Sequence, residues 1–293
     1  MRTKTKIWFG IGAVVVASAE TMRLGGLAPA DARITTQARV TDDLLAGSAL
    51  APTASSAILV AQKRQGGEAG EQGGERGAAK LPPDLDFGLK IAQLRGHLIV
   101  GDELVKQGQW AAALPHFLHP TEEIYGTIRG RLKDYGVPPF DAALRALSNI
   151  VKAKKGGDDY AAARQRVNDA LATADQGLRA KQANWDGFVL EGAVELLKSA
   201  TGEYEEAIVK GRIAKPVEYQ DARGFIWQAE SMIDSVSAGL EKKSADGLKQ
   251  VRAGIAELKK AFPAAMPPKT PVKDLGAVLG DVSGIELAAG KLM

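Results

Sequence analysis

The apolar side chains of residues 81–293 recur with the spacing of α-helices, and this periodicity constrains the fold more than any other feature. Phe87, Ile91, Leu94 and Leu98, for example, share one helical face. No stretch shows the alternation of apolar and polar residues that is typical of a strand. The aromatic content of only 5% also disfavours a β-sandwich or barrel. We therefore predict an all-α fold, an antiparallel helical bundle over residues 81–293.

Prolines and glycines divide this segment into separate helices. Pro82 and Pro83 open the first helix, with Asp84 as a candidate cap, and Gly108 closes it. Another break falls at residues 136–139, which read GVPP. The predicted helices cover residues 84–108, 110–118, 120–135, 140–154, 160–180, 185–200, 203–210, 217–241, 245–262 and, more weakly, 275–292.

The N-terminus has the pattern of a secretory signal peptide. Arg2, Lys4 and Lys6 precede an apolar run at residues 7–17, and Ala17–Ala19 fits a small-residue cleavage site. The run is shorter than the ~20 residues that span a bilayer, although a retained anchor is the alternative. We predict a signal peptide at residues 1–19 and a soluble, exported, periplasmic protein.

Residues 20–80 are predicted to be a flexible, low-complexity spacer. Residues 66–79 read GGEAGEQGGERGAA and contain no apolar side chain larger than Ala, so they cannot offset the entropy cost of ordering. The spacer is either a tether or a segment that orders when it docks on a partner.

Charge and composition exclude several classes of function. The net charge of +3 falls to 3 − 3 = 0 without residues 1–19, which argues against a nucleic-acid binder. The chain has no Cys, which excludes disulfides, Cys-zinc sites and iron–sulfur clusters. It has no Walker motif, EF-hand loop or nucleophile elbow either, and we predict that it is not an enzyme.

Two parts of the helical segment resemble each other. Residues 103–106 read ELVK and residues 195–198 read ELLK, and Gly108-x-Trp110-x-x-Ala113 is matched by Gly202-x-Tyr204-x-x-Ala207. The pattern predicts two related helical hairpins, each with a long helix, a glycine turn and a short helix. Chance similarity in a biased composition is the alternative.

The chemistry of the chain is concentrated in its three histidines. Imidazole and carboxylate groups are the ligands for zinc, iron or copper when thiols are absent. His116 and His119 are one helical turn apart, His97 comes from the preceding helix, and Glu123 follows His119 by four residues. If the two halves face each other, Glu218 joins them. The predicted metal ligands are His97, His116, His119, Glu123 and Glu218.

Structural roles for the same histidines stay open. Pro115 and Pro120 can break the helix that would align His116 with His119, and the apolar face of this segment points away from both. In that alternative His119 caps the following helix, His116 is exposed and His97 hydrogen-bonds at the edge of the core.

One segment resembles a known family. Residues 202–222 read GEYEEAIVKGRIAKPVEYQDA. Tyr204, Ala207, Gly211 and the Glu218–Tyr219 pair are similar to a run in the soluble extracytoplasmic helical region that precedes the membrane part of high-affinity iron permeases. The resemblance covers residues 185–271, and 81–180 more loosely. It implies a helical fold and a setting in metal uptake. We expect no permease activity, because the permease's Arg-Glu-x-x-Glu motif and membrane helices are missing.

A second, local resemblance concerns the first hairpin. Gly101, Gly108, Ala113 and Phe117 follow the spacing of a tetratricopeptide hairpin. A tandem array of such units is missing, so this resemblance implies generic helix-hairpin packing.

The sequence therefore favours a metal-associated binding protein that is accessory to iron uptake and takes a divalent metal or iron. Its expected partner is a membrane transport component. The main alternative is a helical-hairpin module that binds a protein partner without metal, and an exported hydrolase using the His and Glu cluster is a third.

Overall fold

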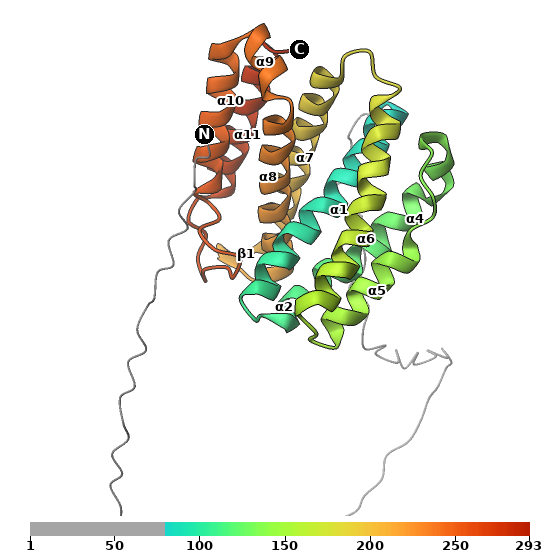
Figure 1. Ribbon diagram of the computed structural model, residues 1–293. Helices are drawn as coiled ribbons and strands as arrows, with labels where there is room; N and C mark the ends of the chain where they lie inside the picture. The colour runs from blue at the N-terminus through green and yellow to red at the C-terminus, as the bar shows by residue number, and fades with distance from the viewer. Residues whose placement is uncertain (1–79) are drawn as a thin grey trace, which may run out of the picture. The chain divides into compact units, whose positions relative to one another are not determined.

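The computed structural model describes residues 80–293, which form a bundle of α-helices (Figure 1). The first half holds α1 (Pro83–Lys106), α2 (Trp110–Ala113), α3 (Pro115–His119), the π-helical turn η1 (Pro120–Ile124), α4 (Tyr125–Ile128), the 3-10 helix η2 (Arg129–Tyr135), α5 (Asp141–Lys152) and α6 (Gly157–Arg179). The second half holds α7 (Trp185–Ala207), β1 (Ile208–Val209), β2 (Arg212–Ile213), α8 (Pro216–Ser235), α9 (Ser237–Lys243), α10 (Ala245–Lys259) and α11 (Leu275–Ala289). The all-α prediction is confirmed; the predicted signal peptide at residues 1–19 and the spacer up to residue 79 lie outside the described residues.

Helix α1 joins the two halves of the bundle. It packs against α7 and α8 on one side and against α2, α3 and α6 on the other (Figure 1). Asp84 does not cap it, because Pro82 occupies the cap position and Asp84 lies in the first turn. There Asp84 accepts hydrogen bonds from the Tyr135 hydroxyl at 2.7 Å and from Gln182 at 2.9 Å.

The described residues contain two apolar cores that meet along α1. Helices α7, α8, α10 and α11 enclose one core, to which α1 adds Leu89 and Ala92. Helices α1, α3, α5 and α6 enclose the other, to which α1 adds Phe87 and Leu98. Because α1 has apolar side chains on more than one face, it is buried from both sides.

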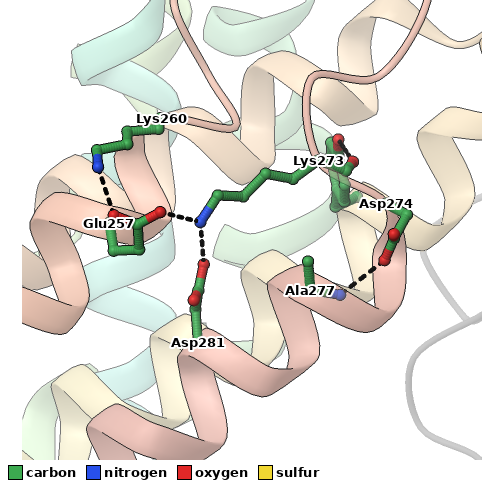
Figure 2. Close-up of polar contacts among 7 residues, drawn as sticks. Glu257, Lys260, Lys273, Asp274, Ala277 and Asp281 are labelled. Atoms are coloured by element: carbon green, nitrogen blue, oxygen red, sulfur yellow. Dashed lines mark hydrogen bonds and ion pairs between the residues drawn. The ribbon is translucent and has the colours of Figure 1, made fainter.

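The connector between α10 and α11 is held by charged side chains (Figure 2). The Lys273 ammonium donates to Glu257 and to Asp281, each at 2.8 Å. Asp274 caps α11 by accepting from the backbone N–H of Ala277 at 2.8 Å. These contacts fix where α11 begins and hold it against α10.

The structure differs from the sequence prediction around residues 200–240. Helix α7 continues through Gly202 to Ala207, so the second half lacks the glycine turn that Gly108 forms at φ 71° in the first. A short hairpin follows α7, with Lys210 and Gly211 at φ 52° and 73° in its turn. The helix predicted at 217–241 is divided at Val236 into α8 and α9.

Candidate metal centre

The close approach of α1 and α8 at a pair of glycines positions the candidate site. A Cβ added at Gly224 would overlap the backbone carbonyl of Gly96, so side chains larger than hydrogen would separate the two helices. His97 follows Gly96, and Asp221 lies about one turn before Gly224. The crossing therefore brings an imidazole of α1 against a carboxylate of α8.

All three histidines of the chain direct Nδ1 toward the carboxylate of Asp221. His97 Nδ1 is 2.6 Å and His116 Nδ1 is 2.7 Å from Asp221 Oδ1. His119 Nδ1 is 3.5 Å from Oδ2. The side chains of His97 and His116 are 0% exposed, that of Asp221 is 1% and that of His119 is 13%. The group is thus buried, with His119 on its more open side.

Helix α3 carries both His116 and His119, and the π-helical turn η1 follows it. Gly101 of α1 allows α3 to pack closely, since a Cβ there would lie 2.7 Å from the Phe117 ring. Pro120 has no N–H to donate to the regular helical ladder, and the chain continues from it as the π turn η1. Such turns occur frequently at functional sites. Pro115 and Pro120 do not break the helix between His116 and His119, because both histidines lie in α3.

The structural alternatives for two of the histidines are wrong. His116 was expected to be exposed in that alternative, but it is completely buried. His119 does not cap the next helix, because η1 has no side-chain capping bond. His97 does form a hydrogen bond, with Asp221, in the interior rather than at the edge of the core.

The short contacts determine where protons must lie in the metal-free protein. An N···O distance of 2.6–2.7 Å requires a proton between the atoms, so His97 and His116 each donate from Nδ1 to Asp221. Burial alone would raise the pKa of Asp221, but the neighbouring histidines outweigh it and hold that pKa well below its usual range. Burial lowers the pKa of His97, and Asp221 offsets this only in part.

Gln220 contacts the other nitrogen of His116. Its Oε1 lies 2.9 Å from His116 Nε2, and its own Nε2 donates to the sulfur of Met266 at 3.7 Å. Gln220 is 1% exposed. Two consecutive residues of α8, Gln220 and Asp221, therefore bracket a single imidazole ring.

The donor set fits a transition-metal ion. One atom from each of His97, His116 and Asp221 lies within 4.8 Å of the others, and two imidazoles with one carboxylate suit iron or zinc. Two ligands of one such ion are about 3.0–3.4 Å apart. The present 2.6–2.7 Å contacts would have to widen by about half an ångström, with the ion in place of the two protons.

The two predicted glutamate ligands have different surroundings. Glu123 lies in η1, and its Oε2 is buried with no hydrogen-bond partner among residues 80–293. Glu218 lies at the start of α8 and pairs with Lys215 at 3.4 Å. Neither glutamate belongs to the group of His97, His116 and Asp221, whose ligand atoms lie within 4.8 Å of one another among the described residues.

Sequence reasoning missed Asp221 and Gln220 as site residues. Helix α8 is buried on every side from Tyr219 to Ile226, so its apolar stripe does not reveal which polar residues point inward. The one available signal is the unusual density of polar residues, Gln220, Asp221 and Arg223, within a buried helix.

A comparison with protein families relates part of the chain to a known domain. Residues 179–293 match the family model of the iron permease-associated 4-helix bundle domain. Searches of curated proteins and of solved structures found no match. Among residues 80–293, no helix is long and apolar enough to cross a membrane.

The matched region begins at the last residue of α6 and contains α7 to α11, hence Gln220 and Asp221 but none of the histidines. Its long helices α7, α8, α10 and α11 pack as four neighbours around one core. Over residues 179–293, the chain therefore resembles the helical region of iron permeases, as the run at residues 202–222 indicated.

Proposed function

We propose that this protein is an exported metal-binding protein accessory to iron uptake, and that its ion lies among His97, His116, His119 and Asp221. One observation carries the proposal. Every histidine of the chain directs Nδ1 toward one buried carboxylate, and that carboxylate belongs to the region that matches an iron permease-associated domain.

Binding of a metal ion would require the loss of the protons that His97 and His116 now carry on Nδ1. Imidazole binds a metal only when the coordinating nitrogen has lost its proton, so a divalent ion would displace the Nδ1 protons of His97 and His116. Asp221 alone would leave one excess positive charge in a buried site. Glu123 is the candidate for the compensating charge, because its Oε2 is buried without a hydrogen-bond partner in the described part of the chain.

The cellular setting rests on two supports. The N-terminal pattern predicts export, and the family match links the helical region to iron permeases. A membrane transport component is therefore the partner that we propose, with this protein holding the ion on the outer side of the membrane.

The test is metal titration of the purified chain by calorimetry, with Fe²⁺ under anaerobic conditions and with Zn²⁺. We expect one ion per chain, and a Kd at least about tenfold weaker in Asp221→Asn. Glu218→Gln is the matched control, since it removes a predicted carboxylate that pairs with Lys215, and it should bind as the wild type does. A folded wild type that binds no ion would refute the proposal and leave the interaction-module alternative.

A further inference from the structure

We propose that Gln220 is a positioning residue that makes Nδ1, rather than Nε2, the metal-binding atom of His116. The inference rests on the proposed function. Its basis is that Gln220 and Asp221 contact opposite nitrogens of the same buried ring, at 2.9 Å and 2.7 Å.

The position of one proton decides which nitrogen can bind an ion. A neutral imidazole carries a single N–H, and its other nitrogen offers the lone pair. In the metal-free protein, His116 Nδ1 donates its proton to Asp221 Oδ1, the oxygen that it shares with His97 Nδ1. When an ion displaces that proton, Gln220 Oε1 keeps the remaining N–H on Nε2, and the lone pair is left on Nδ1. A hydrogen bond to the second ring nitrogen is the usual way in which proteins orient a metal-binding histidine.

Met266 provides the reason why the Gln220 amide points this way. Its thioether can only accept a hydrogen bond, and it lies 3.7 Å from Gln220 Nε2. The reversed amide would place Oε1 against sulfur, where no donor is available, and NH₂ against His116 Nε2. The ring would then keep its proton on Nδ1 and direct its lone pair away from Asp221. The contact with Met266 therefore favours the orientation that frees Nδ1.

Among the described residues, the side chain of Gln220 hydrogen-bonds to the proposed site only at His116. It is 1% exposed, and the ring nitrogen that it contacts faces away from Asp221. Removing a residue of this kind weakens metal binding by about 10–100-fold in other proteins. The same loss is expected here, although every ligand would remain in place.

The experiment combines Zn²⁺ titration with ¹⁵N NMR of the histidine rings in the full chain. In the metal-free wild type, both ring nitrogens of His116 should carry a proton, with Nδ1 donating to Asp221 and Nε2 donating to Gln220. With Zn²⁺ bound, the Nε2 proton should remain and Nδ1 should show the shift of a coordinated nitrogen.

Three variants separate positioning from packing. Gln220→Met keeps the side-chain length but removes the acceptor, and its Zn²⁺ affinity should fall about 10–100-fold. Gln220→Glu keeps an acceptor oxygen and should retain both the Nε2 proton and wild-type affinity. Gln228→Met is the matched control, because Gln228 is another buried glutamine of α8, 6% exposed, that lines a cleft formed with α1, α6 and α7. It should bind Zn²⁺ as the wild type does.

The outcomes distinguish this inference from the proposed function. A wild type that binds no Zn²⁺ overturns both. A wild type that binds Zn²⁺ with His116 Nε2 unprotonated overturns only the role of Gln220. So does a Gln220→Met variant with unchanged affinity and an unchanged His116 spectrum.

Discussion

At the scale of single residues, the candidate site depends on Asp221. Among the described residues, all three histidines face its carboxylate, and its side chain is 1% exposed. A buried charge that loses its partner is costly, because neither water nor another charge replaces the interaction. Asp221 should therefore stabilise the fold of the metal-free protein as well as contribute to metal binding.

Asp221→Ala should lower the free energy of unfolding of the metal-free protein by about 3–5 kcal/mol, since it leaves buried imidazoles without their acceptor. Urea denaturation monitored by circular dichroism measures this change. Glu218→Ala removes a partly exposed ion pair and should cost less than about 1 kcal/mol. Equal effects of the two substitutions would contradict a special role for Asp221.

The sequence allowed the histidines to be identified but not their arrangement. His97, His116 and His119 stand out because they are the only imidazoles and lie close together in the sequence. Asp221 is 124 residues from His97, and its position opposite that ring follows from the glycine contact between α1 and α8. Only tertiary packing defines such a contact, and helical periodicity carries no information about it.

At the scale of helices, glycines set the distance between α1 and α8. Gly224 faces the backbone of Gly96, which cannot move aside in the way that a side chain can. Gly284, in α11, has open space where a Cβ would lie. Substitution of Gly224 therefore tests the close packing of two helices, whereas substitution of Gly284 tests helix propensity alone.

Gly224→Ala should destabilise the protein by about 1–3 kcal/mol, because it forces α1 and α8 apart. Gly284→Ala should stabilise it by up to about 1 kcal/mol through helix propensity alone. Thermal unfolding of both variants measures the difference. If Gly224→Ala leaves the stability unchanged, α1 and α8 must be farther apart than the structure shows.

The α10–α11 connector predicts a dependence of stability on pH. Hydrogen bonds from Lys260 and Lys273 lower the pKa of Glu257 from 4.5 to about 2 (Figure 2). A carboxyl whose pKa is depressed by folding stabilises the protein above its unfolded pKa, and this contribution disappears as pH falls toward the folded pKa.

Glu257→Gln should therefore lower the melting temperature at neutral pH but have little effect near pH 2, with the change falling between about pH 4.5 and pH 2. Calorimetric scans across this range measure it. Because Glu257 lies at the surface, high salt should also reduce the effect at neutral pH. A difference in melting temperature that persists unchanged to pH 2 would contradict the ion-pair explanation.

Some element boundaries could not be read from the sequence. The apolar pattern continues through Ile233, Val236 and Leu240, so it gives no sign that α8 ends at Ser235. The two-residue strands β1 and β2 are too short to show alternation, and only Gly211 indicates their turn. Packing against neighbouring helices, rather than local pattern, sets these ends.

At the scale of the whole described region, the candidate site lies where the two cores meet. The imidazoles come from α1 and α3, and the carboxylate comes from α8 in the matched region. An ion bound there would stabilise the native state by an amount that grows with the logarithm of the ratio of its concentration to its Kd.

Zn²⁺ at about a hundredfold excess over its Kd should add about 2.7 kcal/mol to the free energy of unfolding. Differential scanning calorimetry with and without the ion measures this as a rise in melting temperature. At the same Zn²⁺ concentration, a tenfold weaker Kd should reduce the gain to about 1.4 kcal/mol or less in Asp221→Asn, whereas Glu218→Gln should keep the full rise. A rise of equal size in both variants would place the ion elsewhere.

The position of the carboxylate has a consequence for how the molecule holds together. An ion coordinated by both His97 and Asp221 would close a loop of 124 residues. In this respect it would act like a disulfide, in a chain that has no cysteine. Unlike a disulfide, an ion can be removed without a redox reaction. If the site takes an ion, loading and release of that ion would tighten and loosen the contact between the helices of residues 179–293 and the helices that precede them.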